Sequence, residues 1–240
     1  MDAVLALLTQ SDNVFFAIVS AYILQISIYF FICGNVVLFC HLMLNVLKRG
    51  QLLDDIKLAP SQVKKEVMFS FITSFIYAIY LLVCIYFSTS SVEPLSLLDA
   101  LYYLLSFMVF YDFINYFTHR LFHTAGFKRF HRQHHLSTRV TPWSSSSLHP
   151  VEAVINQVPF LLFVLIIPVP GEMIILFYVY LMLGMACAHS NYNPIAKVEG
   201  FYWLKRYIRF HQRHHKHGNV NYGFLGTHWD YLFGSVEVEK

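Results

Sequence analysis

Long stretches without charged side chains are the feature that most restricts how this 240-residue chain can fold. Residues 14–47 contain no Lys, Arg, Asp or Glu, and residues 67–87 and 97–117 are strongly apolar. About 20 such residues, wound as a helix, span the hydrocarbon core of a bilayer. Each stretch therefore predicts a transmembrane helix, although residues 14–47 are equally compatible with two short helices around Gly34.

A fourth apolar region is divided by a turn. Residues 154–167 and 173–188 flank the sequence Pro-Val-Pro-Gly at 168–171, which predicts a helical hairpin of short or tilted spans. The expected fold class is all-α: a multi-span membrane helical bundle of about four to five spans.

The composition agrees with an integral membrane protein. Hydrophobic residues make up 57% of the chain and charged residues 13%, whereas about 25% of a soluble domain is charged. The net charge of +3 comes from basic residues beside apolar segments, so we expect anionic lipid headgroups as their partner and no nucleic acid. The four cysteines lie in apolar stretches without a Cys-x-x-Cys pair, which predicts lipid-facing or packed thiols and neither disulfides nor zinc ligands.

The basic residues also predict the orientation of the spans. All 17 Lys and Arg lie in residues 48–65, 120–139 and 197–240. Positive charge is enriched on the cytoplasmic side of membrane proteins, so these three regions are expected inside and the N-terminus outside.

Histidine is unusually frequent, with 13 residues in a chain otherwise poor in ionisable groups. Residues at i, i+3 and i+4 share a helix face, so each cluster directs its imidazoles to one point. More nitrogens converge than one ion would use, which predicts two metal ions. The clusters are His119-x3-His123, His131-x2-His134-His135 and His211-x2-His214-His215.

Two other kinds of protein use histidine-rich segments. A metal transporter would place His, Asp or Glu in the middle of its spans, and these spans contain almost none. A zinc-dependent membrane hydrolase needs only a few ligands and an open position. A shell built from histidine alone instead suits the activation of dioxygen in a dry pocket, and the Glu-x-x-His motif of soluble di-iron bundles is absent from the sequence.

These motifs resemble those of the fatty acid hydroxylase and sterol desaturase superfamily of membrane oxygenases. The similarity covers about residues 97–234 and includes the three histidine clusters, His149-Pro-Val-Glu152, His189-Ser-Asn191, Asn221-Tyr-Gly223 and Trp229-Asp-x-x-Phe-Gly234. An extra His-x3-His of the acyl-chain branch is replaced here by His189 with Met185 before it, which is closer to the sterol branch. We therefore expect an N-terminal transmembrane region at 1–96, a catalytic domain at 97–234 and a short tail at 235–240.

The resemblance implies a non-haem di-iron enzyme that hydroxylates or desaturates a lipid or sterol-like substrate with dioxygen. Its histidines would lie at the cytoplasmic membrane face. Electrons would come from a separate protein, such as a ferredoxin or a b-type cytochrome. Zinc is expected to replace iron readily during purification, because imidazole favours zinc over ferrous iron.

Further residues are candidates for supporting roles. His149 and His189 lie at the two cytoplasmic ends of the hairpin, where each is either an additional ligand or a helix-end histidine. The carboxylates and amide expected to hydrogen-bond the ligands are Asp112, Asn115, Glu152 and Asp230. For Glu152 and Asp230 the alternative is a salt bridge with a nearby arginine. His217 and His228 are expected to be auxiliary, and the isolated His41 to be a packed or interfacial histidine.

Overall fold

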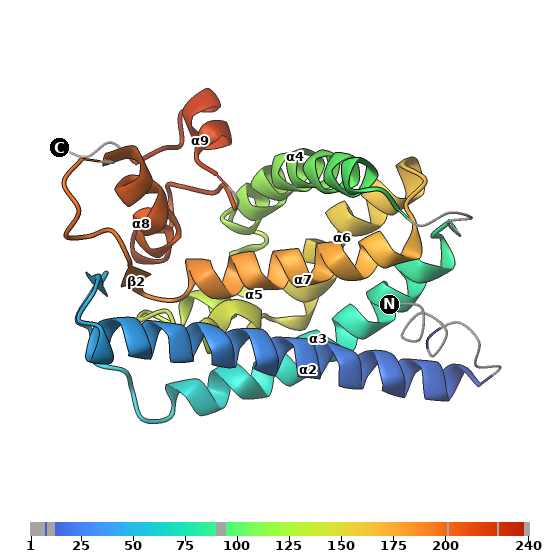
Figure 1. Ribbon diagram of the computed structural model, residues 1–240, viewed down its shortest axis with the longest axis horizontal. Helices are drawn as coiled ribbons and strands as arrows, with labels where there is room; N and C mark the ends of the chain where they lie inside the picture. Colours follow the sequence, from blue (N-terminus) through green and yellow to red (C-terminus); the bar gives the residue numbers. More distant parts are fainter. Residues whose placement is uncertain (1–7, 9–12, 90–94, 201, 225, 238–240) are drawn as a thin grey trace.

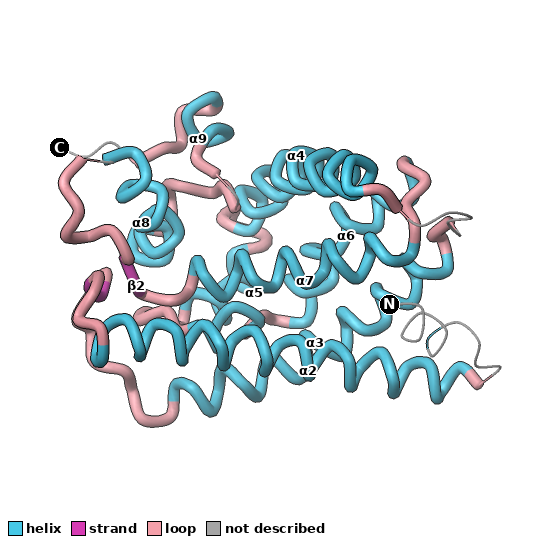
Figure 2. Tube along the Cα trace, viewed as in Figure 1, coloured by secondary structure: helices cyan, strands magenta, loops and turns pink. Residues whose placement is uncertain are grey.

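The computed structural model describes residues 8–237 except 9–12, 90–94, 201 and 225, and it is built almost entirely of helices (Figure 1). Its two strands, β1 (Gln51–Leu52) and β2 (Tyr192–Asn193), form a short antiparallel pair (Figure 2). The long helices are α2 (Val14–His41), α3 (Gln62–Tyr86), α4 (Leu97–Phe122), α6 (Pro150–Ile166) and α7 (Gly171–Ala188). The shorter ones are α5 (Lys128–His135), α8 (Tyr202–His217) and α9 (His228–Leu232), with a π turn at Leu42–Val46 and a 3-10 turn at Pro142–Ser146.

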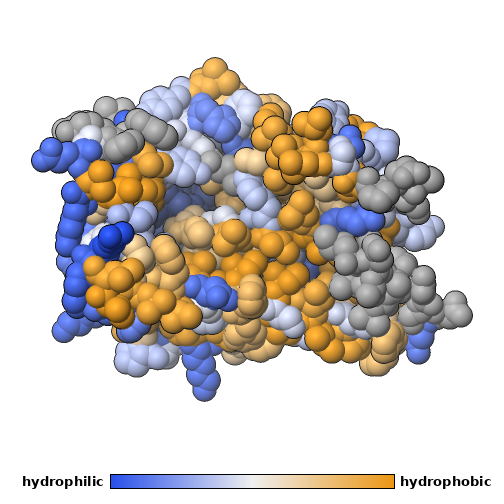
Figure 3. All heavy atoms as spheres, viewed as in Figure 1, coloured by the Kyte–Doolittle hydropathy of each residue, from blue (hydrophilic) through white to orange (hydrophobic). Residues whose placement is uncertain are grey.

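Four of these helices are long and apolar enough to cross a membrane, which confirms the predicted multi-span bundle. They are α2 with its π turn, α3, α4 and α7, while α6 is a shorter apolar helix. The first helix passes through Gly34 without a break, so residues 14–47 form one span and not two. Large apolar side chains such as Phe15, Phe31 and Leu98 are exposed, as lipid-facing residues are. Figure 3 shows apolar residues over much of one face of the bundle.

The halves of the predicted hairpin, α6 and α7, are joined at the expected turn but pack on different neighbours. α6 lies mainly against α3 and α4, and α7 mainly against the 3-10 turn at Pro142–Ser146 and α2. Aromatic rings connect them through α4: Phe107 stacks on Phe177 with ring centroids 4.2 Å apart and meets Phe163 edge-on at 5.3 Å.

One buried carboxylate fixes the polar segment that follows α5. Glu66, in the first turns of α3, is only 2% exposed. Its two oxygens accept hydrogen bonds from Ser137 Oγ at 2.7 Å, Thr141 Oγ1 at 2.6 Å and Gln62 Nε2 at 2.7 Å. Because a buried carboxylate is costly unless it is well bonded, this arrangement holds residues 137–141 against α3 and so fixes where α5 ends.

Candidate metal centre

Four separate helix ends bring the histidines together. α4 continues past its apolar part to carry His119 in its last turn, and His123 caps it. α5 carries the second cluster, His189 caps α7, and α8 carries the third cluster. Since α4, α7 and α8 are far apart in sequence, only the fold of the whole bundle makes these imidazoles converge (Figure 1).

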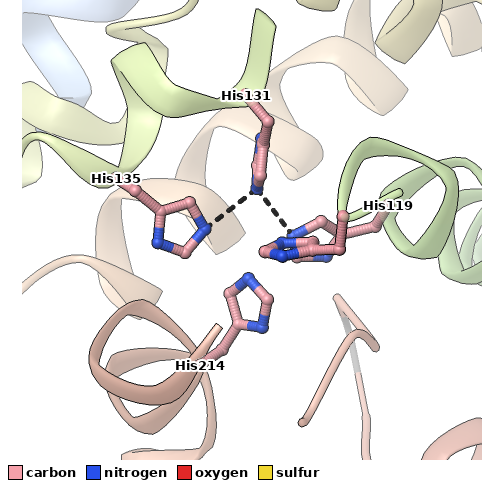
Figure 4. Close-up of side chains that lie close together, drawn as sticks. His119, His131, His135 and His214 are labelled. Atoms are coloured by element: carbon pink, nitrogen blue, oxygen red, sulfur yellow. Dashed lines mark hydrogen bonds between the residues drawn. The ribbon is translucent and has the colours of Figure 1, made fainter. Parts of the chain in front are cut away.

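The first histidine group combines α4, α5 and α8. Its ligand nitrogens all lie within 4.8 Å of one another, and Figure 4 shows four of its rings pointing to one centre. His131 Nε2 lies 3.2 Å from His119 Nε2 and 3.0 Å from His135 Nε2. The members are His119, His123, His131, His135 and His214.

The second histidine group combines α5, α7 and α8, and all its members are buried: His134, His189, His211 and His215. The Nε2 atom of His189 lies 2.6 Å from that of His211 and 3.2 Å from that of His215, which are themselves 3.1 Å apart.

Hydrogen bonds alone cannot satisfy this triangle of nitrogens. A neutral imidazole Nε2 either carries a proton or offers a lone pair. Among three mutually close nitrogens, at least two must therefore both carry a proton or both offer a lone pair, and these two repel each other. A metal ion removes the conflict, because ligands about 2.1 Å from one ion stand about 3 Å apart, close to the spacings found here. Both groups thus have the chemistry and spacing of metal sites.

The protonation of the imidazoles also suits metal binding. Burial, reinforced by repulsion from neighbouring imidazoles, lowers the pKa of His123 and of His189 to about 3. Burial likewise holds the pKa of His134 and of His214 well below the ordinary value. These rings are therefore neutral near pH 7, and the lone pair that a metal requires is free.

Several outward nitrogens of the first group are fixed by acceptors. His131 Nδ1 lies 2.6 Å from Glu152 Oε1, and both side chains are buried. His119 Nδ1 lies 2.8 Å from the Tyr222 carbonyl and His214 Nδ1 lies 2.7 Å from the Val220 carbonyl. Such contacts set the tautomer so that Nε2 faces the centre, as in many metal sites.

The remaining candidates occupy different places. Asp230 Oδ1 and Oδ2 accept hydrogen bonds from the amides of Tyr222 and Gly223, each at 2.8 Å, so Asp230 supports His119 through the loop that carries the Tyr222 carbonyl. Asp112 instead accepts from the Phe224 amide at 3.2 Å and lies 3.0 Å from His228.

His149 lies outside both groups found among the described residues. Its Nδ1 caps α6 by accepting from the Val151 amide at 3.1 Å, and its ring lies 5.1 Å from that of Phe130. The auxiliary His217 lies 3.4 Å from Glu237, and the isolated His41 contacts Asn45 at 3.1 Å.

A cavity opens directly beneath the histidines and extends into the bundle. It encloses about 70 Å³. Its roof includes His119, His131, His134 and His211, and its walls come from α3, α4, α6 and α7. Asn115 of α4, another predicted supporting residue, lines this cavity, and so does Glu152 of α6.

Sequence reasoning missed the carbonyls of Val220 and Tyr222. Every residue has a carbonyl, so residue type carries no signal for this role. A usable signal is Gly223 next to Tyr222: a Cβ there would lie 2.1 Å from the Gly226 carbonyl and 2.9 Å from Asp230 Oδ2. The loop needs glycine for this close approach.

Comparison with known proteins agrees with this geometry. A model of the fatty acid hydroxylase family matches residues 104–235. The chain is 26% identical to lathosterol oxidase from Homo sapiens over 148 residues, which is 60% of this chain and 48% of the relative. It is 31% identical to a Delta(7)-sterol 5(6)-desaturase from Gibberella zeae over 133 residues, 54% of this chain and 40% of the relative. The chain thus spans less than half the length of these relatives, and no solved structure matches it.

Proposed function

Because this chain belongs to the fatty acid hydroxylase family, we propose that it is a membrane-bound non-haem di-iron oxygenase acting on a sterol-like lipid. It would use dioxygen and two external electrons either to hydroxylate a C–H bond or to desaturate a C–C bond. The sterol substrate is suggested by the relatives, which include lathosterol oxidase and Delta(7)-sterol 5(6)-desaturases. The reaction site would lie within residues 97–234, with residues 1–96 as a membrane region.

One observation carries the proposal: two histidine groups form the roof of a cavity that is continuous with the apolar bundle. The first group offers five imidazoles and the second four. His119 and His131 of the first group and His134 and His211 of the second all line this cavity. A lipid in the cavity would therefore meet both groups at once.

The chain's own side chains would prepare this site. When bound, two iron ions would supply the activation of dioxygen, with one oxygen atom leaving as water and the other entering the product in a hydroxylation. Glu152 would keep His131 in the tautomer that faces the centre, and Asp230 would do the same for His119 through the Tyr222 carbonyl. The enclosing helices α3, α4, α6 and α7 would keep bulk water from the reacting carbon.

Electrons would enter at a second cleft, of about 520 Å³, that reaches His215 of the second group. Its lining carries the basic residues Arg209, Arg213 and Lys216 and the carboxylates Asp54 and Glu237, of which Glu237 pairs with Arg213 at 2.7 Å. The excess of positive charge favours a separate acidic electron-transfer protein. With the predicted orientation, this surface and the histidines would face the cytoplasm.

A lipid comparison tests the proposal. Lipids from cells that lack this chain are compared with lipids from wild-type cells by mass spectrometry, with a strain carrying His134→Ala as a matched control. Loss of a product one oxygen heavier than its precursor indicates hydroxylation, and loss of a product two hydrogens lighter indicates desaturation. Identical lipids in all three strains, or full product formation in the His134→Ala strain, would contradict the di-iron oxygenase.

A further inference from the structure

The two histidine groups differ in how their rings are held. In the first group, the Nδ1 atoms of His119, His131 and His214 each face a carboxylate or a backbone carbonyl. In the second group, the Nδ1 atoms of all four rings are buried and have no hydrogen-bond partner among the described residues. The rings of the second group are therefore placed by the backbone segments that carry them, which are α5, the end of α7 and α8.

A loop from the N-terminal part of the chain holds the segment that follows His189. β1 pairs with β2, which begins three residues after His189, and the Leu53 amide extends this pairing by donating to the Asn191 carbonyl at 3.1 Å. Asn191 is 3% exposed, and its left-handed backbone, with a φ of 51°, is one that asparagine tolerates better than most residues. Its side chain bonds both backbone groups of Asp54: Oδ1 accepts from the amide and Nδ2 donates to the carbonyl, each at 3.1 Å.

The side chain of Asp54 joins the same loop to α8. Asp54 Oδ2 accepts a hydrogen bond from Gln212 Nε2 at 2.6 Å, and Gln212 Nε2 also lies 3.4 Å from Asn191 Oδ1. A hydrogen bond to a carboxylate is shorter and stronger than one between neutral groups. Gln212 stands between the ligands His211 and His215 in the sequence of α8, so this bond acts on the helix turn that carries both.

We propose that Asp54 is a positioning residue for the second histidine group. Through Asn191 and Gln212 it fixes the end of α7 relative to α8, and so the approach of His189 Nε2 to His211 Nε2. Metal–ligand distances in proteins vary by only about 0.2 Å, so a small shift between these helices weakens the site.

This role extends the metal centre beyond the histidine-bearing part of the chain. Residues 51–54 lie outside residues 104–235, the stretch that matches the family model. The N-terminal part of the chain thus contributes to the second histidine group as well as to the membrane region. The inference rests on the two-ion centre of the proposed function and adds to it a residue that is not part of any histidine motif.

Exchanging the donor and the acceptor of the Asp54–Gln212 pair isolates its contribution. Asp54→Asn leaves one acceptor oxygen for two donors, the Ile56 amide, now bonded to Asp54 Oδ1 at 3.0 Å, and Gln212 Nε2. Gln212→Glu places a second carboxylate against Asp54. In the double variant, the new amide at position 54 accepts from the Ile56 amide and donates to the new carboxylate at position 212, which restores the pair.

Equilibrium competition for zinc, between the full-length chain in detergent and a chromophoric chelator, tests the inference. Wild-type protein should bind about two zinc ions, and the ion that His189→Ala loses is the one in the second group. Asp54→Asn and Gln212→Glu should each weaken binding of this ion by about tenfold and change binding of the other by less than about twofold. The double variant should recover to within about threefold of wild type. Asp55→Asn, which removes the same charge from an exposed neighbour, is the matched control and should keep both affinities.

The outcomes distinguish this inference from the proposed function. If both single variants hold the second-group ion as tightly as wild type, the positioning role is overturned and the two-ion centre stands. Equal weakening of both ions, or a double variant no better than the single variants, would also overturn it, because either result indicates a general loss of structure. If wild-type protein binds only one zinc ion, the two-ion centre of the proposed function fails and the positioning role fails with it.

Discussion

At the scale of single residues, His189 and His149 show how different two histidines at the ends of one helical unit can be. His189 Nε2 lies 2.6 Å from His211 Nε2, whereas His149 caps α6. We expect His189→Ala to abolish substrate oxidation and to lower the bound metal from about two ions per chain to about one. His149→Ala should retain both ions and most of the activity, at a stability cost of about 1 kcal/mol for the lost cap.

Elemental analysis and a membrane assay supplied with an electron donor measure both effects. His134→Ala and His214→Ala serve as positive controls that should lose activity, and His41→Ala, at the C-terminal end of α2, as a negative control. Metal content near one ion or below in the unchanged protein would contradict the two-ion centre.

Glu152 offers a second test at this scale because its carboxylate touches a ligand from outside the centre. Glu152 Oε1 lies 2.6 Å from His131 Nδ1. Glu152→Gln keeps the shape but replaces the carboxyl group that fixes His131 Nδ1 with an amide, which is a weaker acceptor. We expect metal affinity at the first group to fall by about 10- to 100-fold, measured by competition with a chromophoric chelator.

Glu66→Gln is the matched control for Glu152→Gln. Glu66 is equally buried but bonds hydroxyl groups and Gln62 instead of a histidine. Because Glu66 bonds no histidine directly, Glu66→Gln should lower metal affinity far less than Glu152→Gln. Equal losses in the two variants would mean that Glu152 acts through general stability and not through His131.

The spacing of the histidines was enough to predict most of this arrangement. Residues at i, i+3 and i+4 share a face in any helix, so the three clusters could be recognised before the fold was known. Spacing could not show how the histidines divide between the two groups, because even neighbours in sequence belong to different groups. His135 belongs to the first group and His134 to the second. It also could not distinguish His149 from His189, since both end a helix and only tertiary packing decides which ring turns inward.

At the scale of elements, α5 and α8 each contribute to both histidine groups. α5 supplies His131 and His135 to the first group and His134 to the second, whereas α8 supplies His214 to the first group and His211 and His215 to the second. Two bound ions would therefore tie these short helices to each other and to α4 and α7. A ligand that binds only the folded protein stabilises it, so removing the metal should loosen α5 and α8 first.

Hydrogen exchange before and after chelation measures this effect. Amides of α5 and α8 should exchange faster in the metal-free protein, while those of α2 and α3, which contribute no histidine to either group, should be unchanged. Thermal unfolding should shift to lower temperature and recover when metal is restored. Uniform exchange in all helices, or no change in any, would contradict the linking role of the ions.

The helices themselves were predictable where hydrophobicity alone decides them. Charge-free stretches indicated α2 and α3 closely, because lipid contact demands apolar residues over a fixed length. The extension of α4 to Phe122 and the pairing of β1 with β2 were not predicted. Both depend on partners distant in sequence, such as Asn193 opposite Gln51, which local periodicity does not report.

At the scale of the whole molecule, the two ends of the bundle differ in chemistry. The histidines and basic residues such as Lys48, Arg139 and Lys216 belong to segments at one end. The turn between α6 and α7 lies at the other, where Pro170 pairs with Thr89. The charge asymmetry predicts that the histidine end faces the cytoplasm, where soluble electron donors are available.

Cysteine labelling in intact cells tests this orientation. In a background where the four native cysteines are replaced by serine, Lys216→Cys and Ser96→Cys place single exposed thiols at the histidine end and at the start of α4, respectively. An impermeant thiol reagent should label Ser96→Cys in intact cells and Lys216→Cys only after the membrane is permeabilised. Ser96 precedes α4 and Lys216 follows α7, and both helices are long enough to cross the bilayer. The reverse labelling pattern would therefore mean that the bundle has the opposite orientation in the membrane. It would place the basic cleft beside His215 on the outer surface and so remove the reason for assigning it to a cytoplasmic electron donor.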